Sequence, residues 1–162
     1  MILTVERHER FPMDVNTSSQ TTSSQTADLT RRLYDALAAL DLAELDALLD
    51  PDFIGVLAVG MPFGVGGAHY GADAMRRNGW GAIGQHYVAR AEPEQFAPLV
   101  DGRLLVTGRY VGRGRRGGGS LDAPFAHIIT VTGGRVSRLE QYTDTRALGR
   151  RRSPGFLLRQ NV

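Results

Sequence analysis

The stretch APFAHIITVTGGRVSRLEQYTDT, residues 123–145, places one histidine inside an alternating pattern that is typical of a β-hairpin. The imidazole of His127 has an unperturbed pKa of about 6.5, so it can act as a base or as a hydrogen-bond donor near neutral pH. A strand histidine can equally be a packed residue that bonds to a neighbour. Its chemistry depends on which side chain of the second strand faces it.

The turn decides that partner, and the hairpin residues alone leave two registers open. A three-residue turn at Thr132–Gly134 places Leu139 opposite His127 and makes Gln141 its diagonal neighbour, about 7–8 Å away. A two-residue turn made of the glycine pair shifts the register by one. It then brings Glu140 opposite the histidine, a pair suited to acid–base catalysis.

Other carboxylates give no clear second site. Asp144 immediately precedes the residues TRAL, a position typical of a helix cap. A carboxylate base inside a pocket would have to come from a position such as Asp52, Glu92, Glu94 or Asp122. No histidines and carboxylates have a metal-ligand spacing, so we expect no metal.

Composition narrows the function classes. The 162 residues contain no cysteine, which excludes disulfides, thiolate metal sites and a cysteine nucleophile. The formal net charge is only +2, and no apolar run reaches the roughly 18 residues of a membrane helix. The GRGRRGGGS segment, residues 112–120, has no interleaved aromatic residues, so it favours a loop over a nucleic-acid contact. We expect a cytoplasmic protein that binds neither membrane nor nucleic acid.

The chain order indicates an α+β fold. Residues 1–26 end in a Ser/Thr/Gln tract, which predicts a disordered polar leader, and residues 149–162 predict a basic tail. Leu29, Leu33, Leu37 and Leu40 predict a helix, followed by a short one that Asp41 caps and that ends at Pro51. A third helix is expected at 72–83. Strands are expected at 53–59, 86–98, 103–112, 121–131 and 135–143.

Taken together, these helices, the loop PFG…HYG and the ending DAPFAHIITVTGGRVSRLEQYTDT resemble the SnoaL-like polyketide cyclases and ketosteroid-isomerase-related proteins of the nuclear transport factor 2-like superfamily. The likeness covers about residues 27–148. It implies a cone, in which a curved antiparallel sheet wraps about three N-terminal helices around a deep apolar pocket. It also implies a homodimer formed through the outer face of the sheet.

Within the resemblance, His127 takes the position of the cyclase histidine, and Gln141 stands where the cyclases have a catalytic aspartate. This match favours the three-residue turn, because both side chains must face the pocket. An amide cannot act as a general base, so the usual cyclase mechanism lacks its base. Tyr34 and Trp80 lie on expected helices whose apolar faces would line the cone, either as core residues or as part of the pocket wall. We expect both of them, together with Phe125, Leu57 and Leu139, to contact the substrate.

Two functions follow from the resemblance. The first is a cofactor-independent cyclase or isomerase for a polyketide-like or other hydrophobic metabolite, as in antibiotic biosynthesis, with His127 and Gln141 as catalytic residues. The second is a non-catalytic ligand-binding or assembly module of the same fold. An open cavity of several hundred cubic ångströms with converging polar groups favours the enzyme, whereas a cavity filled by its own side chains favours the module.

Overall fold

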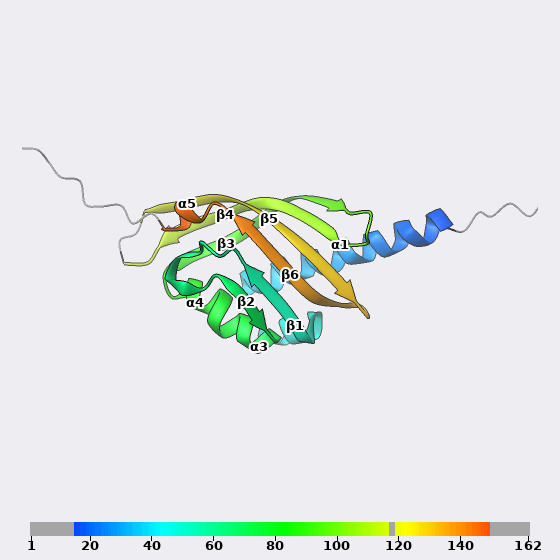
Figure 1. The fold of residues 1–162 in the computed structure, drawn as a ribbon, viewed down its shortest axis with the longest axis horizontal. Helices are drawn as coiled ribbons and strands as arrows, with labels where there is room; N and C mark the ends of the chain where they lie inside the picture. Colours follow the sequence, from blue (N-terminus) through cyan, green and yellow to red (C-terminus); the bar gives the residue numbers. More distant parts are fainter. Residues whose placement is uncertain (1–14, 117–118, 150–162) are drawn as a thin grey trace, which may run out of the picture.

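The computed structural model describes residues 15–116 and 119–149 and shows a curved, open sheet with helices inside its curve (Figure 1). The helical elements lie mostly before and between the first strands: α1 (Val15–Ala39), α2 (Leu42–Leu48), η1 (Pro62–Gly64), α3 (Ala72–Ala74), η2 (Met75–Trp80), α4 (Gly81–Gly84) and α5 (Thr145–Gly149). The strands are β1 (Leu49–Leu57), β2 (Gly67–Tyr70), β3 (Tyr87–Pro98), β4 (Leu104–Gly114), β5 (Ser120–Thr132) and β6 (Arg135–Thr143). This is the expected α+β layout.

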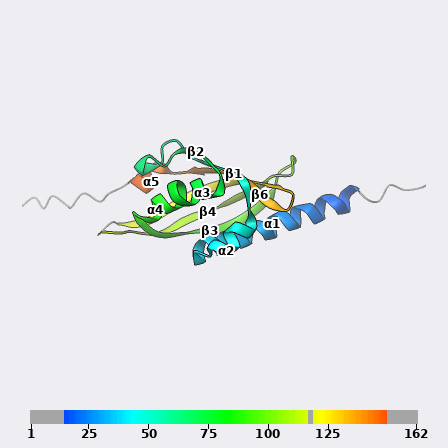
Figure 2. The ribbon, with the colours of Figure 1, turned by 90° about the horizontal axis from the view of Figure 1, so that it is seen from below.

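The described strands form one sheet in the order β2-β1-β6-β5-β4-β3. Strands β3 to β6 follow one another as an antiparallel meander, and β1 joins it parallel to β6. The α3–η2–α4 stretch lies between the two ends of the sheet, as Figure 2 shows. Its middle is a π-helical turn, and the whole stretch occupies the place of the third expected helix.

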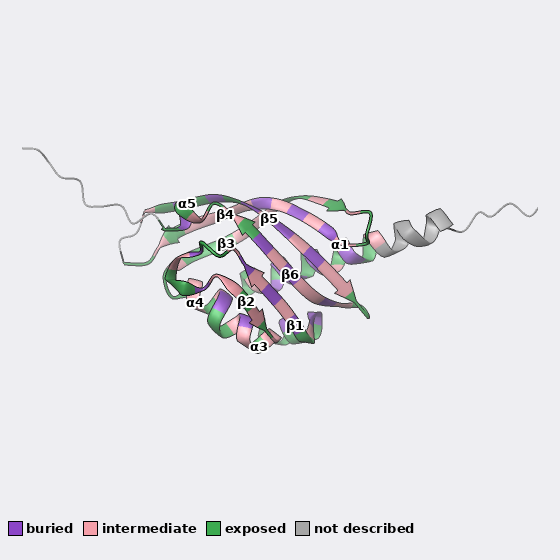
Figure 3. Cartoon of the chain, in the orientation of Figure 1, coloured by how far each residue is buried: buried purple, intermediate pink, exposed green. Residues whose placement is uncertain are grey.

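The core lies on the inner face of the sheet, because alternate strand residues point toward the helices. In β5 the alternation is regular, and Leu121, Phe125 and Ile129 are all buried (Figure 3). Leu33 of α1 and Phe53 of β1 close this core and are fully buried. Apolar burial of this kind stabilises the fold by about 25 cal/mol for each square ångström removed from water.

The strand pairing in the hairpin between β5 and β6 differs from both expected registers. Thr132 pairs with Arg135, so the turn is the two-residue one, and both glycines between them adopt positive φ. Between Thr130 and Val131 the register then shifts, because β6 carries an extra residue in a β-bulge. The favoured three-residue turn is therefore wrong. The bulge nevertheless places Gln141, and not Glu140, opposite His127.

Helix α1 and strand β1 both begin earlier than expected. Residues 15–26, expected to be disordered, belong to α1, since no glycine or proline interrupts them after Val15. Strand β1 begins at Leu49, so Pro51 lies inside the strand next to a register irregularity and does not simply end α2. Asp41 caps α2, as expected. Residues 1–14 and 150–162 lie outside the described part.

Two further differences concern single segments. Leu40, expected on the apolar face of the first helix, is 80% exposed because the chain turns there with φ of 55°. Strand β2 forms inside the Gly-rich loop, where no strand was expected, by pairing with β1. Among the described residues no helix combines the length and the apolar character that a membrane crossing needs.

Candidate functional site

A pocket of about 300 Å³ opens inside the curve of the sheet. Leu37 and Leu45 contribute from α1 and α2, and Trp80 and Ile83 come from the helical stretch across from them. Leu148 of α5 also lines the pocket. The pocket wall is thus mostly apolar, as in pockets that take hydrophobic small molecules.

The polar part of this wall is one connected set of side chains. The hydroxyl of Tyr34 (α1) lies 2.7 Å from Nδ1 of His127, and the hydroxyl of Tyr110 (β4) lies 2.7 Å from Nε2 of the same ring. Gln141 (β6) donates from Nε2 to the Tyr110 hydroxyl over 2.7 Å. We call these four side chains the polar wall; all four line the pocket.

His127 is held in its neutral form. Its side chain is only 4% exposed, and burial lowers its pKa to about 3. Burial also raises the pKa of Tyr34 and of Tyr110 above the usual value, because a phenolate would be poorly solvated there. Near neutral pH the polar wall therefore carries no charge.

Aromatic packing fixes the histidine ring. Phe125 stacks on His127 with ring centroids 4.2 Å apart, and Tyr34 lies parallel to the histidine ring at 5.9 Å. Gly108 of β4 pairs with Phe125, and a Cβ at this glycine would lie 2.8 Å from the ring atom Cζ. The missing side chain of Gly108 thus leaves the space that Phe125 occupies.

The structure brings most of the expected site residues together. Tyr34, Trp80, Leu57 and Leu139 all line the pocket with the histidine and the glutamine. Phe125 is buried and packs behind the polar wall, and it is not among the residues that line the cavity.

Gln141 lies opposite His127 in the strand pair, yet its side chain donates its hydrogen bond to Tyr110 of β4. The sequence interpretation missed this residue, Tyr110. The signal was available: Tyr110 continues the inward alternation of Leu104 and Val106 along β4.

Carboxylates stay outside the pocket. None of the described residues that line it is an aspartate or a glutamate. Asp122 pairs with Arg109, Glu92 pairs with Arg90, and Asp144 accepts hydrogen bonds from the backbone at the start of α5, the capping role expected for it. The described part of the chain also contains no group of three His, Cys, Asp or Glu residues that could hold a metal ion.

Two arginines line the pocket, and both form ion pairs with carboxylates. Arg76 forms ion pairs with Asp46 and Asp73, and the largely exposed Arg90 forms one with Glu92. Both guanidinium groups are thus matched by carboxylates that do not line the cavity. An anionic ligand would find no unpaired cation among the described residues that line the pocket.

Comparison with known proteins agrees with this architecture. The chain resembles a nuclear transport factor 2-like protein of unknown function from Burkholderia pseudomallei, with 27% identity, a TM-score of 0.67 and coverage of 75% of this chain and 92% of that one. A similar protein from Burkholderia thailandensis gives 26% identity and a TM-score of 0.66, covering 79% and 94% of the two chains. A putative polyketide cyclase from Sinorhizobium meliloti shares 25% identity, with a TM-score of 0.58 and coverage of 74% and 98%.

No curated protein matches the chain. The family model that describes the SnoaL-like domain matches residues 30–139, which is more than half of the 162 residues and contains the pocket-lining part of α1 and most of the sheet. The chain belongs to the SnoaL-like domain family.

Proposed function

We propose that this protein is a cofactor-independent isomerase or cyclase that acts on an enolisable, hydrophobic small metabolite of polyketide-like character. The observation that carries the proposal is His127, held 2.7 Å from two tyrosine hydroxyls in a pocket that is otherwise mostly apolar. The open cavity of about 300 Å³ with converging polar groups supports the enzyme over the non-catalytic module. The similarity to a putative polyketide cyclase also supports it.

The chemistry of the proposal is the formation of an enol. A phenol hydroxyl that donates to a ligand carbonyl stabilises the negative charge that grows on its oxygen. His127, acting together with Gln141 and the tyrosines, would help the proton leave the neighbouring carbon. The apolar walls, among them Trp80 and Leu57, would hold the carbon chain in the conformation that reacts. The enol then isomerises or attacks a second carbonyl to close a ring.

The test uses an apolar bicyclic ketone, β-tetralone, whose size suits a pocket at the small end of the ligand-binding range. Wild-type protein should accelerate the exchange of its α-hydrogens for deuterium in D₂O, followed by proton NMR. His127→Ala should reduce this rate by about 100-fold or more while the circular dichroism spectrum stays that of the fold. The control is Tyr142→Phe, on the strand that carries the glutamine but exposed outside the pocket.

Two results would reject the catalytic role. An unchanged exchange rate in His127→Ala would remove the histidine from the mechanism. Binding of β-tetralone by the wild type, seen as a change in the fluorescence of Trp80, without any exchange would favour the binding module.

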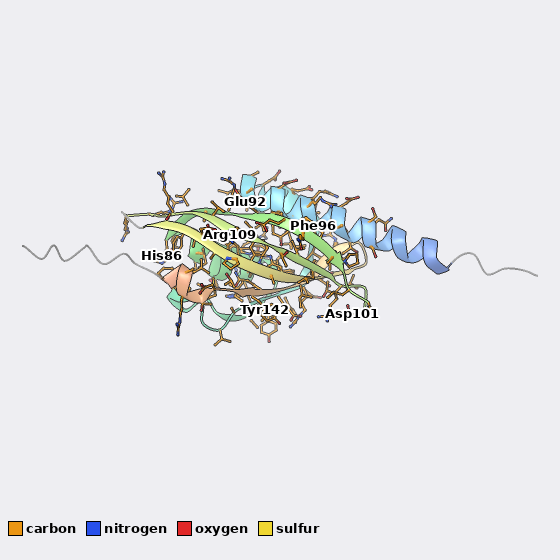
Figure 4. All side chains as sticks on the ribbon, turned by 90° about the horizontal axis from the view of Figure 1, so that it is seen from above. His86, Glu92, Phe96, Asp101, Arg109 and Tyr142 are labelled. Carbon is orange, nitrogen blue, oxygen red and sulfur yellow. The ribbon has the colours of Figure 1, made fainter. Side chains whose placement is uncertain are left out.

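We also propose that a second copy of the chain covers the outer face of the sheet. Phe96 lies beside α1 in Figure 4, whereas Tyr142 projects from the other side of the sheet and is 54% exposed. Leu105 and Ile128 pair across this outer face and are only half-buried. Light scattering should give the mass of a dimer, and Ile128→Arg should give the monomer; a wild-type monomer would contradict the proposal.

A further inference from the structure

Within the polar wall, Tyr34, His127 and Tyr110 together carry more polar hydrogens than the hydrogen bonds between them require. The neutral imidazole of His127 carries one N–H, and Tyr34 and Tyr110 carry one O–H each, so three hydrogens serve the two bonds that join the ring to the hydroxyls. If Tyr110 donates to Nε2, then Nδ1–H donates to Tyr34, whose own hydrogen is free. In the other tautomer the free hydrogen belongs to Tyr110. Either tautomer leaves one phenol hydrogen for a ligand.

The other end of the polar wall has an unused acceptor. Gln141 is only 7% exposed, and its Nε2 bonds to Tyr110, while its buried Oε1 has no hydrogen-bond partner among the residues that the structure describes. Buried polar atoms normally have a partner, so this carbonyl is free to accept a hydrogen bond from a bound ligand. The polar wall therefore holds one free phenol hydrogen and one free carbonyl acceptor on side chains that line the same pocket.

We infer that Tyr34, His127 and Tyr110 form a charge-neutral proton relay, and that Gln141 anchors a hydroxyl of a neutral, enolisable hydroxy-ketone through its free Oε1. This inference rests on the proposed function and specifies both the transfer and the ligand. Tyr110 receives a proton from the ligand, and Tyr34 returns a proton to the ligand carbonyl oxygen. His127 passes the proton between them by changing its tautomer.

The step balances without charging any residue. The ligand C–H bond breaks and its proton bonds to the Tyr110 oxygen, while the hydrogen of Tyr110 moves to Nε2 of His127. The hydrogen on Nδ1 moves to the Tyr34 oxygen, and the hydrogen of Tyr34 moves to the ligand carbonyl oxygen. The electron pair of the C–H bond becomes the carbon–carbon double bond of the enol. Both phenols stay neutral, and the imidazole ends as its other neutral tautomer.

The surroundings favour such a relay over an ionic mechanism. Among the described residues, His127 contacts Tyr34 from α1, Tyr110 from β4 and Phe125 on its own strand, and Gln141 of β6 lies opposite it. None of these carries a charge, and the arginines lining the pocket are paired with carboxylates outside it. A neutral ligand fits this wall better than a carboxylate, which would face the lone Oε1 with a second acceptor.

The relay also explains why an amide takes the place of an acid. A carboxylate at position 141 would accept hydrogen bonds only, so it would compete with His127 for the hydrogen of Tyr110. The amide instead donates to Tyr110 and leaves that hydrogen for Nε2. Gln141 thus orients Tyr110 as a positioning residue and contacts the ligand with its other atom.

The decisive experiment measures deuterium exchange into β-tetralone by wild type, His127→Gln, Tyr34→Phe and Tyr110→Phe. The glutamine variant keeps one donor and one acceptor but cannot change tautomer, and each phenylalanine variant keeps the ring and loses the hydroxyl. All three should exchange at least about 100-fold more slowly, and Tyr142→Phe should match the wild type. The wild-type rate constant for bound ligand should be flat between about pH 5 and pH 9, because burial moves the pKa of His127 below this range and the pKa values of both tyrosines above it.

A second measurement needs no variant. Nitrogen-15 NMR of histidine-labelled wild-type protein should show one protonated and one bare nitrogen for His127 across the same pH range. In addition, hydroxylated β-tetralone should bind more tightly than β-tetralone and β-naphthoate, and in Gln141→Leu it should bind no more tightly than β-tetralone. Equal binding of the two ketones by the wild type would overturn the role of Gln141 as the anchor.

The outcomes separate the two proposals. If the wild type exchanges but His127→Gln exchanges equally fast, or if the rate titrates with an imidazole pKa, the relay is wrong and the proposed function stands. Detection of an imidazolium at neutral pH likewise overturns the relay. If the wild type does not exchange at all, the proposed function fails and the relay fails with it.

Discussion

Buried neutral His127 should make the protein lose stability in acid, and the size of the loss follows from its environment. In the unfolded chain the imidazole has an ordinary pKa of about 6.5, whereas burial lowers it to about 3 in the fold. Between these values the unfolded chain binds a proton that the folded protein does not. Above the unfolded-state pKa of about 6.5 the histidine therefore costs no stability. The free energy of unfolding then falls as the pH is lowered from that value toward 3.

The slope in this window is about 1.36 kcal/mol for each pH unit. From pH 7 to pH 4.5 the wild type should lose about 2.5 kcal/mol through His127 alone. Well below both pKa values the loss would reach about 4.8 kcal/mol. The side chain is only 4% exposed, so solvent screening reduces these figures little.

The assay is urea unfolding followed by fluorescence of Trp80, the single tryptophan, at both pH values in wild type and His127→Gln. The carboxylates titrate equally in the two proteins, so the difference between their pH responses isolates the histidine. The variant should be less sensitive to acid by about 2.5 kcal/mol. Equal responses would show that the folded protein accepts a proton on His127 at ordinary pH, which would refute the assignment of a neutral ring.

Three other perturbations test the parts that position the site. In Gly108→Val a Cβ would clash with the backbone carbonyl oxygen of Glu92 on β3 and would lie 2.8 Å from the Phe125 ring, so the free energy of unfolding in urea should fall by about 1–3 kcal/mol, and an unchanged value would show that both the neighbouring strand and the ring have room to move. Gly134→Val places a β-branched residue at φ of 75° and should cost about 1–2 kcal/mol, measured against Gly84→Ala, where the φ is ordinary and a Cβ would meet nothing. Asp144→Ala removes the cap of α5 and should lower the melting temperature by an amount equivalent to about 1 kcal/mol; Asp144→Asn should recover most of it.

Strong periodic signals in the sequence predicted most of the sheet. The expected strands at 86–98, 103–112, 121–131 and 135–143 agree closely with β3 to β6, because alternation and Gly-rich turns act locally. The bulge in β6 could not be inferred in this way. It lets Val136 and Leu139, which are three positions apart, both point into the core, and so the sequence pattern shows no clean face.

The candidate site was predictable only in part, for a related reason. His127 and Gln141 lie on neighbouring strands, so a register argument could connect them. The actual connection passes through Tyr110, whose distance from both in the sequence hides it until the sheet is assembled. The start of α1 could not be predicted for a different reason. The polar tract from Val15 lacks apolar periodicity, yet it forms the first turns of a helix whose later turns pack against the core.

An amide at position 141, where the resemblance to the cyclases implies a carboxylate, changes what the rest of the pocket must do. A single carboxylate base acts through its own charge, and it needs few partners. A neutral wall has to gain its reactivity from the cooperation of several weak groups, so their geometry must be fixed closely. The ring of Phe125 and the space left by Gly108 supply that constraint around His127. On this reasoning, substitutions behind the polar wall should affect the exchange rate almost as strongly as substitutions within it.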